Sequence, residues 1–151
     1  MPYRKLSIGL LFLSVAVYIA ALFQKISICL DGNCGDWPGY LILLVGWLGV
    51  ADGLSNLAWI ANPLIFVAWI AIWFGHSRYG LMWALPAFAF AVSFSYARAA
   101  IAKSDHRPLT GSWIGTWGLE TGYWLWLAAI AIGCLAAVLA EPSHAEDRGT
   151  I

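Results

Sequence analysis

The stretch from position 40 to position 74 constrains the fold most, because it contains no lysine or arginine and only one acid, Asp52. As a single helix it would extend about 52 Å, whereas the hydrocarbon core of a bilayer is about 30 Å thick. Pro63 has no N–H to donate within a helix and disfavours helical geometry at the residue before it, so a break is expected there. The sequence therefore predicts a span over residues 40–61 and a short or re-entrant arm over residues 64–79.

The chain as a whole is too apolar for an ordinary soluble domain. Of its 151 residues 62% are hydrophobic and 11% are charged, and the formal net charge is zero. A soluble domain is about half apolar and about a quarter charged, so lipid must cover the excess. We therefore predict an all-α, polytopic integral membrane protein, a helical bundle of four to five transmembrane segments. Its expected partner is the lipid bilayer, and the lack of a basic cluster argues against nucleic acid.

Three further apolar runs complete the predicted domain. Long spans are expected over residues 6–23, 81–102 and 123–140. Together with the central stretch they make residues 1–140 a single transmembrane domain. Residues 141–151 form a polar tail with too little apolar content to fold alone.

The ten tryptophans make the chain tryptophan-rich, and several of them fall at the ends of predicted spans. These are Trp37, Trp73, Trp113, Trp117, Trp124 and Trp126. Such placement is typical of an aromatic belt, because the amphipathic indole ring prefers the headgroup level. A tryptophan-lined ligand cage is the less favoured interpretation.

The distribution of basic residues predicts an orientation in the cell (plasma or inner) membrane. Arg4 and Lys5 precede the first span, which places the N-terminus in the cytoplasm. Five crossings then place the C-terminus outside and leave a modest cytoplasmic excess of lysine and arginine, whereas four crossings leave none. The five-crossing arrangement puts residues 24–39 outside and residues 103–108 inside.

Residues 24–39 are expected to form an external loop that contains Cys29 and Cys34. An oxidising compartment would let these two cysteines pair, and the Asp-Gly-Asn sequence between them is suited to a turn. The C-x4-C spacing is not the C-x-x-C of redox enzymes, so a structural disulfide is favoured over thiol chemistry.

One face of the predicted span over residues 40–61 is small and polar. At about 100° per residue, a single sector holds Gly46, Gly49, Asp52, Gly53 and Asn56. Gly49 and Gly53 allow close backbone approach, and the two polar side chains lie one turn apart. We expect the face with the three glycines to meet protein, either a partner or a second copy of the chain.

Asp52 supports two hypotheses. An intramembrane carboxylate is costly and is by default a functional candidate, for an ion, a proton or a solute. The favoured interpretation is structural: a protonated or hydrogen-bonded aspartate that fixes helix packing through Asn56 or Asn62.

The sequence contains no recognisable catalytic or metal-binding pattern. The hydrolase, metalloprotease, P-loop and dinucleotide motifs are all missing, and the three histidines lie in separate segments without metal-ligand spacing. We therefore predict no catalytic residue, no metal and no cofactor. The favoured function is a non-enzymatic accessory or interaction protein, as a complex subunit or an immunity-type membrane protein. The alternative is a small-solute, ion or proton pathway built around Asp52, Asn56 and Asn62.

Overall fold

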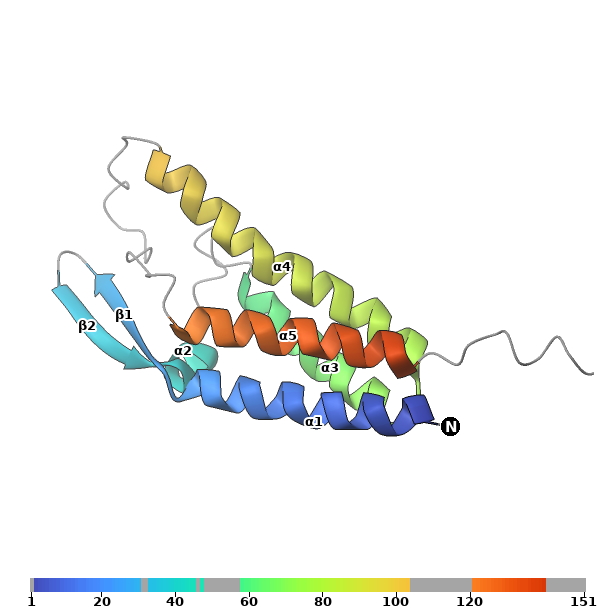
Figure 1. Ribbon diagram of the computed structural model, residues 1–151. Helices are drawn as coiled ribbons and strands as arrows, with labels where there is room; N and C mark the ends of the chain where they lie inside the picture. The colour runs from blue at the N-terminus through green and yellow to red at the C-terminus, as the bar shows by residue number, and fades with distance from the viewer. Residues whose placement is uncertain (1, 31–32, 46, 48–57, 104–120, 141–151) are drawn as a thin grey trace, which may run out of the picture.

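The computed structural model describes residues 2–30, 33–45, 47, 58–103 and 121–140. Five helices and one two-stranded sheet make up this part of the chain (Figure 1). In chain order they are α1 (Pro2–Leu22), β1 (Lys25–Leu30), β2 (Asn33–Pro38), α2 (Gly39–Val45), α3 (Ala61–Trp73), α4 (Ser77–Lys103) and α5 (Thr121–Ala140). The predicted helical class is thus confirmed, with the addition of a hairpin.

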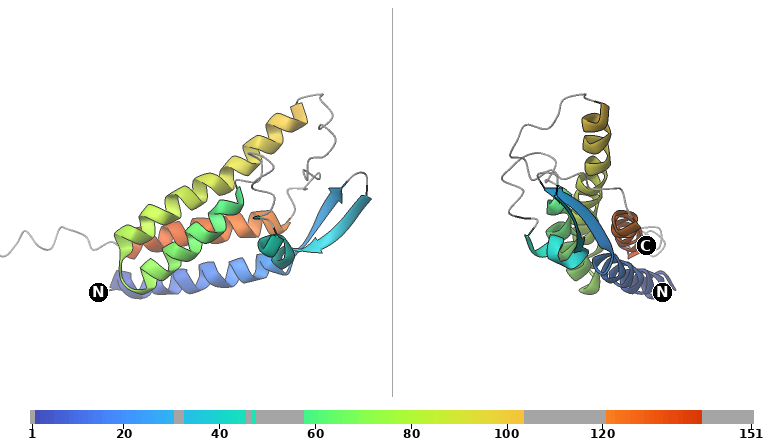
Figure 2. Two further views of the ribbon diagram at one scale, coloured as in Figure 1. Left: turned by 180° about the vertical axis from the view of Figure 1, so that it is seen from behind. Right: turned by 90° about the vertical axis from the view of Figure 1, so that its left-hand side faces the viewer.

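Helices α1, α3, α4 and α5 lie side by side as a bundle (Figure 1). Ser7 of α1 contacts Ala136 of α5 and Ser14 contacts Ala129, so these two helices are antiparallel. The direction alternates at each step around the bundle. As a result, the N-terminus of α1 and the C-terminal end of α5 lie at one end, and the hairpin lies at the other (Figures 1 and 2).

The segment expected as an external loop contains the antiparallel hairpin β1–β2, and its external position stays a prediction. Its register pairs Ile26 with Trp37 and Cys29 with Cys34. Ile26, Ile28 and Leu30 alternate with smaller side chains, a period of two that favours a strand. The hairpin projects beyond the end of α1 (Figure 1).

Pro63 lies in the first turn of α3, so the proline begins a helix rather than ending one. A first-turn residue has no intrahelical partner for its N–H, which makes proline acceptable there. A 3₁₀ turn over residues 58–60 leads into the helix. Within residues 40–61 the described helix covers only α2 and the start of α3, so a span over this stretch stays a prediction.

The turn between α3 and α4 is set by Gly75, whose φ of +79° lies in the left-handed region. The amide of Gly75 donates to the carbonyl of Ile72 at 3.0 Å, and that of His76 donates to Ala71 at 2.8 Å. These two bonds form the Schellman motif, which satisfies the last carbonyls of a helix when glycine takes this conformation. A second glycine, Gly80, allows α4 to return close to Ile72.

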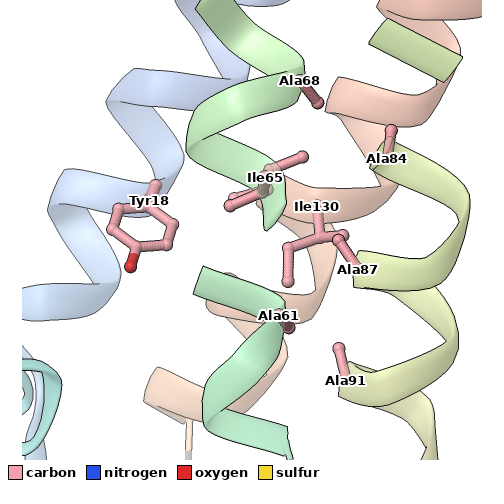
Figure 3. Close-up of a cluster of buried hydrophobic side chains, with 9 residues drawn as sticks. Tyr18, Ala61, Ile65, Ala68, Ala84, Ala87, Ala91 and Ile130 are labelled. Atoms are coloured by element: carbon pink, nitrogen blue, oxygen red, sulfur yellow. The ribbon is translucent and has the colours of Figure 1, made fainter. Parts of the chain in front are cut away.

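The bundle core consists mainly of small side chains (Figure 3). Among the described residues, the largest side chains that are fully buried are Ile65, Ile130, Ser7 and Ser14. Most of the remaining core is alanine: residues 61, 68, 84, 87, 91, 129, 136 and 137. The large apolar side chains lie on the outside, including Phe12, Ile70, Trp83, Leu85, Trp124 and Leu135.

Within the part of the chain that the structure describes, two helices are long and apolar enough to cross a membrane, judged by length and composition. They cover Arg4–Leu22 and Thr121–Ala140, and Ala58–Trp73 is a shorter apolar helix. These findings are compatible with a membrane location, and the number of crossings stays a prediction.

Candidate functional site

Of the residues proposed from the sequence as a packing face or solute site, the structure describes only Asn62. Gly46, Gly49, Asp52, Gly53 and Asn56 lie outside the described residues, so their predicted roles are not tested.

Asn62 lies in the first turn of α3 and is buried, with 7% of its surface exposed. Its Oδ1 accepts two hydrogen bonds at 2.8 Å, one from Tyr18 Oη of α1 and one from Trp126 Nε1 of α5. An indole nitrogen can only donate, so the atom that faces Trp126 must be the amide oxygen. These three residues, which we call the polar centre, therefore tie three helices to one acceptor.

Aromatic side chains surround the polar centre on the side between α1 and α3. The ring of Tyr18 meets Phe66 and Trp69 edge to face, with centroid distances of 5.4 and 5.3 Å. Nearer the N-terminus of α1, Phe12 meets Trp73 in the same way at 5.8 Å. We call this contact between α1 and α3 the aromatic seam.

The contact between α1 and α5 is built differently, from two serines that are seven residues apart. Ser7 Oγ donates to the carbonyl of Ala136 at 2.8 Å, and Ser14 Oγ donates to that of Ala129 at 2.7 Å. Ser14 also accepts a hydrogen bond from Trp69 Nε1 at 3.0 Å, which links this contact to α3. We call the contact between α1 and α5 the serine seam.

Two glycines of α5 allow the close approach of the serine seam. A Cβ atom added at Gly133 would lie 2.9 Å from Ile65 Cδ1 and 3.2 Å from Ser14 Oγ. One added at Gly122 would lie 3.0 Å from the Cβ of Gln24. Helices in membranes commonly associate through such small residues and through side-chain hydrogen bonds.

The sequence reasoning missed this small-residue face, although its signal was present. Ser7, Ser14 and Ala21 are spaced by seven on the first helix, and Gly122, Ala129 and Ala136 are spaced by seven on the last. A size pattern at this spacing marks one helix face.

The hydrogen bonds of the polar centre and the serine seam join only neutral groups. Cys134 belongs to the same packing, since its Sγ donates to the carbonyl of Ala84 at 3.3 Å. Among the described residues, no three histidine, cysteine or acidic side chains lie together so that they could hold a metal ion. The arrangement described here is suited to holding helices in register.

The structure does not support the predicted disulfide between Cys29 and Cys34, because it describes the backbone of these two residues and not their side chains. The two residues are direct cross-strand partners in the hairpin. Such a register brings the Cα atoms close, but a disulfide also requires the sulfurs to lie about 2 Å apart.

Comparison of the chain with protein-family models, with curated proteins and with solved structures finds no match.

Proposed function

We propose that this chain is an integral membrane protein that acts as a non-enzymatic accessory or interaction subunit. The observation that supports its membrane location is the inverted distribution of side-chain size in the bundle. In water, each buried methylene group contributes about 0.8 kcal/mol, so a soluble protein buries its large apolar side chains first. Here most of the described buried side chains are alanine or serine, and Ile65 and Ile130 are the largest fully buried apolar groups, while many leucine, phenylalanine and tryptophan side chains face outward.

A bilayer explains this distribution because lipid tails are as apolar as leucine. Helices in lipid gain little by hiding large apolar groups, and they associate by close packing of small residues and by hydrogen bonds between helices. The serine seam has both features, in the contacts of Ser7 and Ser14 and in the close approach at Gly133.

The alternating helix directions favour four crossings. The hairpin and the C-terminal end of α4 lie at one end of the bundle, and the turn at Gly75 lies at the other (Figures 1 and 2). If α1 starts in the cytoplasm, the end of α5 is cytoplasmic too. This arrangement differs from the five crossings predicted from the sequence, which place the C-terminus outside and residues 103–108 inside.

Single-cysteine labelling tests this topology. In a variant whose three native cysteines are replaced by serine, an impermeant maleimide is applied to sealed vesicles carrying Lys25→Cys, His76→Cys or Asp105→Cys. Four crossings predict that positions 25 and 105 react from outside and that position 76 reacts only after permeabilisation. Reaction of position 105 from inside would support the five-crossing arrangement predicted from the sequence. Reaction of all three positions from one side would exclude a bundle that spans the membrane.

The proposed accessory role is supported by the use of polar groups in packing. The polar side chains described above form hydrogen bonds with neighbouring helices. They belong to Tyr18, Asn62, Trp126, Ser7 and Ser14. Affinity purification from native membranes in a mild detergent tests the role. A stoichiometric partner, or a second copy bound through the face with Gly46, Gly49 and Gly53, is the expected result. Recovery of the chain alone as a monomer would count against it.

The second candidate function is a small-solute, ion or proton pathway around Asp52, Asn56 and Asn62. It is favoured by the burial of Asn62, a polar side chain that lies where three helices meet. Flux into liposomes that contain the purified protein tests this function. Flux that is abolished by Asp52→Asn would support the pathway, and the absence of any flux would exclude it.

A further inference from the structure

Helix α2 and the residues that flank it present an uncharged, aromatic face to the outside of the molecule. Tyr40 and Leu44 lie four residues apart on one face of α2, and Trp37 of β2 and Trp47 flank the helix in the sequence. All four are exposed, Leu44 to 64% and Trp47 to 56%. No charged residue occurs between positions 37 and 47.

The opposite side of α2 is fixed to the bundle. Gly39 lies so close to the end of α1 that a Cβ atom there would stand 2.9 Å from the carbonyl oxygen of Ala21. The amide of Gly39 donates to the carbonyl of Gln24 at 3.0 Å, and Trp59 Nε1 donates to the carbonyl of Leu43 at 2.9 Å. Leu43 itself packs against the core. The helix therefore cannot turn its aromatic face inward without losing these contacts.

Helix α2 lies crosswise to the bundle. In the left view of Figure 2, α1 runs across the picture and α2 is seen nearly end-on. In the right view, α1 is foreshortened and α2 lies across the picture. If the bundle axis follows the membrane normal, α2 lies parallel to the membrane plane.

The level of α2 along the bundle matches one surface of a bilayer. Arg4 and Leu22, the ends of the apolar helix α1, are about 27 Å apart along the helix axis, close to the thickness of a hydrocarbon core of about 30 Å. Gly39 packs against Leu22 at the other end of α1 from Arg4, so α2 lies at the opposite boundary of the hydrocarbon core. Tryptophan and tyrosine prefer this headgroup level.

We infer that the face formed by Trp37, Tyr40, Leu44 and Trp47 is an anchor that inserts into the interfacial region of one lipid leaflet. This inference rests on the proposed membrane location. At the end of α1 against which Gly39 packs, the apolar side chains of Ile19 and Phe23 are exposed as well. Because the anchor carries no lysine or arginine, it binds through apolar area, and its insertion does not require anionic lipid.

Spin labelling at three positions tests the anchor. Leu44→Cys reports on the face, Val67→Cys reports on the outward side of α3 at its middle, and Lys25→Cys reports on the exposed start of the hairpin. Each is made in the variant without native cysteines and is reconstituted in phosphatidylcholine vesicles. Collision with oxygen, which concentrates in lipid, is then compared with collision with a water-soluble nickel chelate.

We expect the ratio of oxygen to nickel collisions to rise several-fold from position 25 to position 44 and again from position 44 to position 67. The same order is expected when part of the phosphatidylcholine is replaced by phosphatidylglycerol. A lipid-exposed position 67 with a water-exposed position 44 would overturn the anchor alone. A position 44 that neither reagent reaches would mean that protein covers the face, and insertion only with phosphatidylglycerol would make the binding electrostatic; both overturn the inference. A water-exposed position 67 would overturn the membrane location itself.

Discussion

Helix α1 contacts its two neighbours in opposite ways. Along the serine seam it approaches α5 through Ser7, Ser14 and the space left by Gly133, and hydroxyl groups donate to backbone carbonyls. Along the aromatic seam, rings such as Tyr18 and Trp69 fill the distance to α3. One contact depends on side chains being small, and the other depends on side chains being large.

The two seams should therefore be weakened by opposite changes in side-chain size. Close approach leaves no room for added atoms, so the serine seam should be sensitive to enlargement. A contact filled by rings loses its packing when a ring is removed, so the aromatic seam should be sensitive to truncation. Four predictions test this contrast. For each variant, the free energy of unfolding in detergent or bicelles is compared with that of the wild type.

The largest effect is expected for Gly133→Leu in the serine seam. The new side chain would collide with Ile65 and displace the hydrogen bond between Trp69 and Ser14, at a cost of about 3 kcal/mol or more. Ala131→Leu, on the exposed side of the same helix, is the matched control and should be nearly neutral. Equal stability of the two variants would show that α1 and α5 do not approach closely.

Trp69→Ala should have the next largest effect, through the aromatic seam. It removes ring contacts with Tyr18 and Phe66 and leaves a cavity. Because lipid cancels much of the transfer term that operates in water, we expect a loss of about 2 kcal/mol. Trp69→Phe should restore most of this loss. Trp83→Ala, at a more exposed tryptophan of α4, is the control for a general effect of removing an indole ring.

Within the serine seam, Ser14→Ala should be more destabilising than Ser7→Ala. Ser14 takes part in two hydrogen bonds and Ser7 in one, and an interhelical hydrogen bond in a membrane contributes about 0.6 kcal/mol on average. We therefore expect losses of about 1 and about 0.6 kcal/mol. The reverse order would show that Trp69 does not share the Ser14 hydroxyl.

The smallest effect is expected where the two seams meet, at the polar centre. Tyr18→Phe keeps the ring and removes one of two hydrogen bonds to Asn62, at a cost of about 0.6 kcal/mol. Trp126→Phe removes the other hydrogen bond to Asn62, and a similar loss of stability is expected. The double variant leaves a buried carbonyl unpaired, so its loss should exceed the sum of the single losses by about 1 kcal/mol. Strict additivity would mean that the oxygen of Asn62 has other donors.

The sequence predicted the helical class because long runs without charge leave few alternatives. It could not predict which helices pair, since the first and last helices are apolar on every face and their hydrophobic pattern does not distinguish one face from another. Only side-chain size does so, and that pattern becomes meaningful when Ser14 and Ala129 are known to meet.

Asn62 illustrates how far a candidate site could be predicted. The sequence named it only as a hydrogen-bond partner of Asp52 or as part of a solute pathway, and the structure shows it buried at the junction of three helices. Its partners Tyr18 and Trp126 stand 44 and 64 residues away along the chain, and no local pattern connects them. The hairpin was missed for another reason: its alternating isoleucines were read only as part of a loop between spans.

The separation of the serine pairs along the chain bears on how the protein is made. Ser7 and Ala136 are 129 residues apart, so at 5–20 residues per second a ribosome needs roughly 6 to 26 s to deliver the partner of Ser7. Helices α3 and α4, joined by the turn at Gly75, can pair almost as soon as they are synthesised. The first helix is therefore synthesised long before the last, and the hydroxyl groups of Ser7 and Ser14 lack their partner carbonyls until α5 is complete.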